Sequence, residues 1–210
     1  MNSASHTTKQ SPLASIESPR VDGPISIVIA AIAAALVALP GISELLQFDR
    51  TAILAGEWWR MLTSHLTHFG TSHLFWDVLM FLVLGCLCER QSRKQFIACL
   101  IASAGLISLV VLTVSPEMQI YRGLSGIDTA LFTLVAVTLL KQKWAERDTT
   151  WVIAIASLLT ALIVKIAIEM SGATIFVDAH EAGFVPAPLA HVVGATIGIV
   201  VSLGGHGPSL

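Results

Sequence analysis

Six polar or ionisable side chains lie inside otherwise apolar stretches of this sequence. In hydrocarbon such a side chain costs several kcal/mol unless it is paired or hydrated, so each one is a candidate functional residue. The set includes serine and histidine, the residue types that supply a nucleophilic hydroxyl and the base that activates it. The residues are His73, Asp77, Ser125, Asp128, Lys165 and His191.

Ser125 has the sequence context of a nucleophile. It stands in the run Gly123-Leu124-Ser125-Gly126, where an expected loop enters an apolar helix. The glycines allow another part of the backbone to approach closely, and the free N–H groups at a helix start can stabilise a developing oxyanion. The GxSxG motif of soluble hydrolases is not met, because Ile127 replaces its last glycine.

The same serine also has a structural interpretation. Ser125 and Asp128, three residues apart, fit a capping box, in which two side chains satisfy free N–H groups at a helix start. Capping and catalysis do not exclude each other, so both interpretations of Ser125 stay open.

His191 is the candidate base. It could accept the hydroxyl proton of Ser125 and later give it to a leaving amine. The alternative is a histidine that is hydrogen-bonded between helices, beside a packing face formed by Gly194 and Gly198.

The remaining histidines and the lysine predict no metal and no cofactor. His65, His68 and His73 could ligate zinc, but their spacings do not stack them on one helical face, and no cysteine or carboxylate on the same side completes a set. Lys165 and Glu169 fit an ion pair near a helix end, with the lysine reaching toward the interface. We assign this pair no chemistry.

The composition excludes a soluble domain. Of the 210 residues, 54% are hydrophobic and 12% are charged, whereas soluble domains carry about 25% charged residues. The charges nearly balance, with 12 Lys and Arg against 14 Asp and Glu, and no basic run is present. We therefore expect the lipid bilayer, and no nucleic acid, as a partner.

Six apolar runs, each near the roughly 20 residues that cross a bilayer, define the organisation of the chain. They predict an all-α polytopic membrane protein with six transmembrane helices in one domain, residues 23–204. Residues 1–22 are expected to form a disordered cytoplasmic tail, and residues 205–210 a short C-terminal tail. The runs cover residues 24–42, 71–88, 95–114, 124–140, 150–168 and 187–203.

The distribution of Lys and Arg predicts that both termini are cytoplasmic. Eight of the twelve basic residues lie in the N-terminal tail and in the second and fourth connections. The second, fourth and sixth helices then run inward from the outer face, which brings His73, Ser125 and His191 to one depth. We expect a multi-pass protein of a bacterial inner membrane with its site open to the extracytoplasmic side.

The long first connection, about residues 43–70, is expected on the outer side. Its central run is amphipathic and rich in tryptophan, which is enriched at the membrane interface, so it predicts an interfacial element. This run is Gly56-Glu57-Trp58-Trp59-Arg60.

Several short motifs follow one another along the chain. They are Gly56-Glu57-Trp58-Trp59-Arg60, His68, His73, Gly85, Glu89-Arg90, Gly123-Leu124-Ser125-Gly126, His191, Gly194 and Gly198. In this order, on a six-helix plan, they resemble the rhomboid family of intramembrane serine proteases. The resemblance covers roughly residues 43–203.

The resemblance implies peptide-bond hydrolysis by a Ser-His dyad, with Ser125 as nucleophile and His191 as general base. It also implies an oxyanion site made by the Ser125 backbone N–H and side chains of the second helix, where His73 and Asp77 lie. The implied substrate is a single-pass membrane protein or a C-terminal membrane anchor. The compact six-helix form further resembles the rhombosortase branch, which implies processing of the C-terminal anchors of exported proteins.

Two positions depart from the family pattern. Rhomboids usually carry Asn where this chain has Asp77; a protonated Asp77 could donate as Asn does, or an ionised one could hold His73 as an imidazolium donor. Many rhomboids carry an aromatic residue where this chain has Thr129. The adjacent Asp128 either orients His191 or caps the helix, and we expect the cap.

Two other functions stay in view. A catalytically inactive rhomboid-like protein could bind transmembrane helices as a chaperone or trafficking factor, and Asp77 is the main feature in its favour. A small transporter would use the intramembrane charges as an ion path, but we find no internal repeat that supports it.

Overall fold

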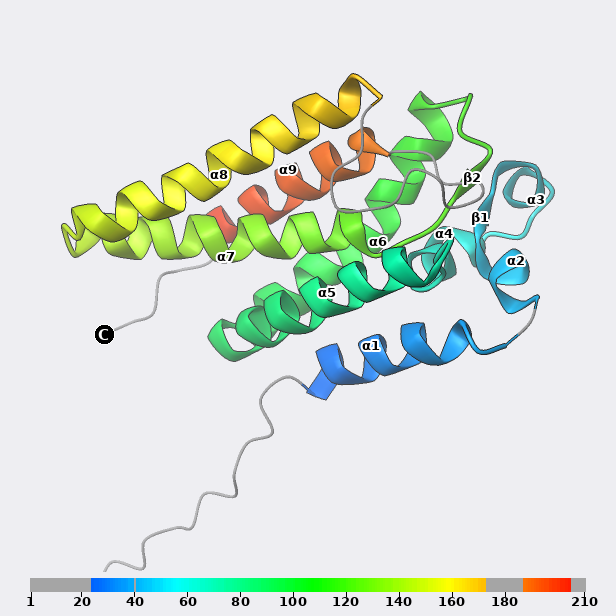
Figure 1. Cartoon of the computed structure of the whole chain (residues 1–210), viewed down its shortest axis with the longest axis horizontal. Coiled ribbons are helices and arrows are strands. Elements are labelled where there is room, and N and C mark those ends of the chain that lie inside the picture. The colour runs from blue at the N-terminus through cyan, green and yellow to red at the C-terminus, as the bar shows by residue number, and fades with distance from the viewer. Residues whose placement is uncertain (1–23, 40, 173–186, 205–210) are drawn as a thin grey trace, which may run out of the picture.

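The computed structural model describes residues 24–39, 41–172 and 187–204. Six long helices account for most of this part of the chain, and each corresponds to one of the apolar runs (Figure 1). The expected tails, residues 1–22 and 205–210, lie outside the described residues. The helices are α1 (Pro24–Leu36), α5 (Thr71–Gln91), α6 (Arg93–Val114), α7 (Ser125–Ala145), α8 (Thr149–Met170) and α9 (Pro188–Gly204).

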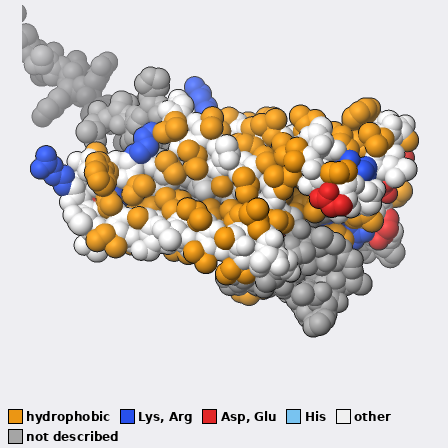
Figure 2. Space-filling model, turned by 90° about the horizontal axis from the view of Figure 1, so that it is seen from above, with side chains coloured by type: hydrophobic (Ala, Val, Ile, Leu, Met, Phe, Trp, Pro, Cys, Tyr) orange, Lys and Arg blue, Asp and Glu red, His pale blue; other side chains and the backbone are white. Residues whose placement is uncertain are grey.

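The helices confirm an all-α membrane protein. Within the described residues, α5, α6 and α8 are long and apolar enough to cross a membrane, and α1 and α9 are shorter apolar helices. Apolar side chains cover the face in Figure 2, whereas charged side chains gather at its two ends. On α8, only Ile155 and Glu169 are buried, so nearly the whole of this helix presents apolar surface outward.

Helix α7 lies at the centre of the bundle and packs against α5, α6, α8 and α9. All residues from Gly126 to Leu131 are buried, as expected for a helix surrounded by others. The N-terminal ends of α5, α7 and α9 point toward the same end of the molecule (Figure 1). The first turns of these three helices therefore lie at one end of the bundle, and α7 contacts both α5 and α9.

The first helix is shorter than its apolar run. The run extends over residues 24–42, but α1 ends at Leu36. Proline cannot continue a helix, and Pro40 is followed by Gly41, whose φ of +76° lies in the left-handed region. Only the last residue of the run, Ile42, belongs to the next, short helix.

The N-terminal end of α1 is attached to the C-terminal half of α5. The Glu89 carboxylate accepts hydrogen bonds from the backbone N–H and the hydroxyl of Ser26, both at 3.2 Å. A Cβ added at Gly85 would lie 2.6 Å from the Ser26 hydroxyl. Glu89 therefore satisfies free N–H groups at the start of α1, and Gly85 lets the two helices approach.

The first connection folds into an ordered unit at one end of the bundle (Figure 1). Its strand β1 (Phe48–Asp49) pairs antiparallel with β2 (Ile120–Tyr121), which lies between α6 and α7, and this pairing places Phe48 opposite Tyr121. Trp58 and Trp59 are 58% and 52% exposed, as an interfacial element requires. The elements are α2 (Ile42–Leu46), β1 (Phe48–Asp49), α3 (Arg50–Leu54), α4 (Arg60–Thr63), the 3-10 helix Ser64–Leu66 and β2 (Ile120–Tyr121).

Arg50 fixes this connection to α6. Its guanidinium donates to the carbonyl oxygens of Leu112 at 2.7 Å, Val111 at 2.9 Å and Ser115 at 2.6 Å. The last carbonyls of a helix have no partner within the helix and favour a positive charge. Arg50 supplies both the donors and the charge.

Glycines set the distance between α7 and α9. A Cβ added at Gly194 would overlap the Gly126 carbonyl oxygen, and one added at Gly198 would overlap the Ala130 carbonyl and the Thr133 hydroxyl. Small residues of this kind allow helix backbones to pack closely inside a membrane.

We expect Gly194→Ala to lower the free energy of unfolding by about 1–3 kcal/mol, because the new methyl group meets backbone atoms that cannot rotate away. Thermal unfolding in detergent measures the loss. The matched control is Gly105→Ala in α6, where a Cβ meets nothing within 4 Å. This control should be neutral or stabilising, and equal behaviour of the two variants would contradict the role of Gly194.

Candidate functional site

Ser125 is the first residue of α7, and the loop before it is held in place from several sides. Gly123 has a φ of +117°, and its N–H donates to the Ser64 carbonyl at 3.2 Å. The Tyr121 hydroxyl donates to the Gly123 carbonyl at 3.3 Å. A Cβ at Gly123 would lie 2.7 Å from Nε2 of His73, so only glycine fits this loop.

Asp77, on α5, contacts the loop that precedes Ser125. Its Oδ2 accepts the backbone N–H of Leu124 at 2.8 Å. Nε2 of His73 and Nε2 of His68 each lie 3.2 Å from the same oxygen. Oδ2 of Asp77 thus acts as an acceptor toward the loop before Ser125 and lies between two imidazole rings.

His191 lies in the first turn of α9 and is only 6% exposed. Its Nδ1 lies 2.6 Å from Oε2 of Glu169, a residue of the last turn of α8. Its Nε2 is buried and has no hydrogen-bond partner among the described residues. Among the described residues, Nδ1 therefore has a hydrogen-bond partner and Nε2 has none.

The turns that carry Ser125 and His191 contact each other through the adjacent residues Gly126 and Ala190. A Cβ on Gly126, which follows Ser125, would lie 3.3 Å from both Cβ and the carbonyl oxygen of Ala190, which precedes His191. No hydrogen bond joins the Ser125 hydroxyl to Nε2 of His191. The two side chains stand on turns that contact each other.

Asp128 corrects the sequence analysis. The capping box is not formed, because Leu124 is the N-cap and Ser125 is already the first helical residue. This shift of one residue moves Asp128 out of the position that a capping box needs. Its Oδ1 is buried and has no hydrogen-bond partner among the described residues, and Nδ1 of His191 is bound by Glu169 instead.

Glu169 and His68 were not assigned to this region from the sequence. Glu169 forms the expected ion pair with Lys165, at 2.5 Å, but its second carboxylate oxygen contacts His191. His68 contacts Asp77 from the segment before α5. An acidic residue directly after an apolar run was the available signal for Glu169; its distance along the chain from His191 gave no spacing to recognise.

Neutral groups fix the segment before α5 to α6. Nε2 of His65 lies 3.0 Å from the Ala104 carbonyl, and the His65 ring packs edge-on against Tyr121. Burial lowers the pKa of His65 and raises the pKa of Tyr121, so both side chains are uncharged near neutral pH. They act as packing and hydrogen-bonding groups.

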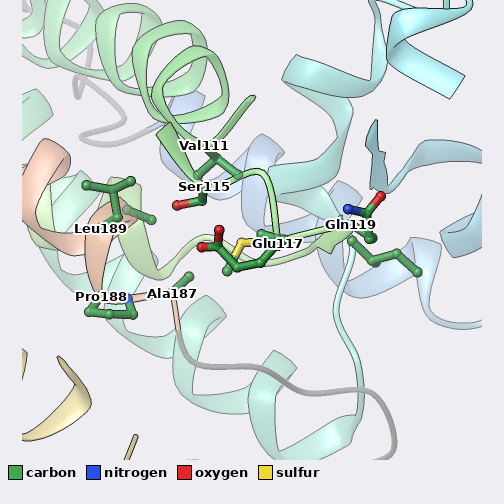
Figure 3. Close-up of a pocket in the computed structure, with 10 residues that line it drawn as sticks. Val111, Ser115, Glu117, Gln119, Ala187, Pro188 and Leu189 are labelled. Carbon is green, nitrogen blue, oxygen red and sulfur yellow. The ribbon is translucent and has the colours of Figure 1, made fainter. Parts of the chain in front are cut away.

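A cavity of about 450 Å³ lies beside the start of α9 (Figure 3). Its walls come from the end of α6, the segment leading to β2 and the first residues of α9. Ala190, which packs against Gly126, lines it, so the cavity reaches the turn that carries His191. The Glu117 side chain extends into this space toward Ala187 (Figure 3).

In the part of the chain that the structure describes, no group of three or more His, Cys, Asp or Glu side chains is arranged to hold a metal ion. The polar atoms gathered here are a hydroxyl, imidazoles and carboxylates. Together they are suited to moving a proton between a hydroxyl and an imidazole.

Comparisons with known proteins identify the family. No curated protein matches the chain. The family model of the Rhomboid domain matches residues 55–207, a span that includes α5 to α9 and both Ser125 and His191. This match covers well over half of the chain, and the chain therefore belongs to the rhomboid family.

Proposed function

We propose that this protein is an intramembrane serine endopeptidase in which Ser125 is the nucleophile and His191 the general base. Rhomboid proteins are typically proteases of this kind. The observation that carries the proposal is the buried, unpartnered Nε2 of His191 on a turn that packs against the turn next to Ser125.

In the proposed reaction, Oγ of Ser125 attacks the carbonyl carbon of the scissile peptide while its proton passes to Nε2 of His191. The negative charge on the carbonyl oxygen is stabilised by the backbone N–H of Ser125, which as the first helical N–H has no partner within the helix. Collapse of the tetrahedral intermediate expels the amine, which takes the proton from His191. Water then hydrolyses the acyl-enzyme by the same steps.

Asp77 has a supporting role in this proposal. Its hydrogen bond to the Leu124 N–H fixes the residue immediately before Ser125. It also lies beside His73, so a protonated His73 would be stabilised next to the oxyanion site. Gly123 and Gly126 allow the close approach of this loop to α5 and α9.

The proposed substrate is a single transmembrane helix or a C-terminal membrane anchor that enters from the bilayer. We propose six transmembrane helices with both termini cytoplasmic in a bacterial inner membrane, and a site that opens to the outer side. One feature supports this arrangement: the basic residues of the α5–α6 and α7–α8 connections lie at the end opposite the site. Exposed tryptophans lie at both ends, Trp58 and Trp59 near the site and Trp144 and Trp151 opposite it, as expected for helices that cross between two membrane interfaces.

The test of the nucleophile is reaction of the detergent-solubilised protein with a fluorophosphonate probe, with the labelled residue identified by mass spectrometry. We expect labelling of Ser125 in the wild type and none in Ser125→Ala or His191→Ala. Ser157→Ala, which removes an exposed hydroxyl from α8, is the matched control and should label normally. A folded wild type that does not label would favour the inactive, helix-binding alternative.

The test of Asp77 compares two substitutions. Asp77→Asn keeps an oxygen that can accept the Leu124 N–H, whereas Asp77→Ala leaves this buried donor unpaired, at a cost of about 1–3 kcal/mol. We therefore expect Asp77→Ala to lower the unfolding temperature and the labelling rate much more than Asp77→Asn. Equal losses in the two variants would show that the charge of Asp77, and not its hydrogen bond, is required.

A further inference from the structure

We infer that Glu169 is the positioning residue of His191, so that the site operates as a Ser-His-Glu triad rather than a dyad. The inference rests on the proposed function, because it assigns a role to Glu169 in the same reaction. The resemblance to the family implies only the serine and the histidine.

The first argument is the burial of Glu169. Helix α8 presents apolar side chains outward along nearly its whole length, yet it turns this carboxylate inward, where 8% of the side chain is exposed. A carboxylate is costly in hydrocarbon unless it is paired, so its place at the start of α9 needs a reason. Its partner there is the candidate base.

The second argument is which nitrogen the carboxylate holds. Oε2 of Glu169 lies 2.6 Å from Nδ1 of His191. An ionised carboxylate only accepts hydrogen bonds, so Nδ1 carries the proton, and in the neutral ring Nε2 is left with its lone pair. This is the tautomer that a general base needs at Nε2, the nitrogen that has no partner among the described residues.

The third argument is the pairing of the other carboxylate oxygen. The ammonium group of Lys165 lies 2.5 Å from Oε1 of Glu169, one helical turn away. This contact fixes the carboxylate and keeps it ionised, so Oε2 is directed at His191. When His191 takes the proton of Ser125, the imidazolium formed lies against a negative charge that is already in place.

Asp128, the acid that the sequence considered for this role, has no hydrogen bond to His191, and Asp77 is bound to the loop before Ser125. Glu169 is therefore the acid in contact with the base, among the described residues.

The experiment compares Glu169→Gln and Glu169→Asp with the wild type in fluorophosphonate labelling, separating probe binding from the rate of the chemical step. We expect Glu169→Gln to lower the chemical rate at least about 100-fold with unchanged probe binding, by analogy with triads that lose their acid. Glu169→Asp should recover part of the rate. Glu146→Gln, which changes an exposed acid in a similar pair with Lys143, is the matched control and should label normally.

A second measurement does not depend on catalysis. Nitrogen NMR of histidine-labelled protein, with His191 assigned by comparison with His191→Gln, reports which ring nitrogen carries the proton. We expect protonated Nδ1 in the wild type and a downfield Nδ1–H proton signal that moves upfield in Glu169→Gln. Protonated Nε2 in the neutral ring of the wild type would overturn the inference.

The two failures are distinguishable. If the folded wild type does not label, the proposed function is wrong and the catalytic role of Glu169 falls with it. If the wild type labels at Ser125 and Glu169→Gln labels at the same rate, the proposed function stands and the inference is overturned. A fall in rate that accompanies a comparable fall in unfolding temperature, with no recovery in Glu169→Asp and no change in the NMR signal, would also overturn it.

Discussion

The close backbone contact between α7 and α9 is the constraint on which the site depends. Gly194 and Gly198 let α9 approach to where any side chain would overlap the backbone of α7. The same approach sets Ala190 against Gly126, one residue away from His191 and Ser125 respectively. The separation of Ser125 and His191 is thus determined by helix packing, which is more rigid than a loop.

Three buried acids, unlike Asp128, are matched to donors from another part of the chain. Asp77 on α5 binds the loop before α7, and Glu169 on α8 binds His191 on α9. Glu89, at the other end of α5, binds the start of α1. Because unpaired carboxylates are costly in an apolar interior, these contacts fix the helix ends relative to one another as well as tuning the chemistry.

The helices and their directions, which depend on the apolar pattern, were predicted from the sequence, whereas side-chain contacts between helices were not. Alternating helix direction was enough to bring Ser125 and His191 to the same end of the bundle. The capping box of Asp128 failed because the helix begins at Ser125, one residue earlier than that motif requires. Glu169 was not assigned to the site from the sequence, because its ion pair with Lys165, one helical turn away, already explained its position. Its contact with His191 joins two different helices.

The attachment of α1 and β1 sets the size of the folding unit. The Rhomboid family match begins at residue 55, after both elements. Phe48 is fully buried opposite Tyr121, and Ser26 is the partner of the buried Glu89. A fragment cut at the family boundary would leave the β2 edge unpaired just before the loop that precedes Ser125, and would leave Glu89 with Arg93, 3.7 Å away, in place of its partners on α1. The part of the chain that packs around Ser125 therefore extends beyond the part that the family model matches.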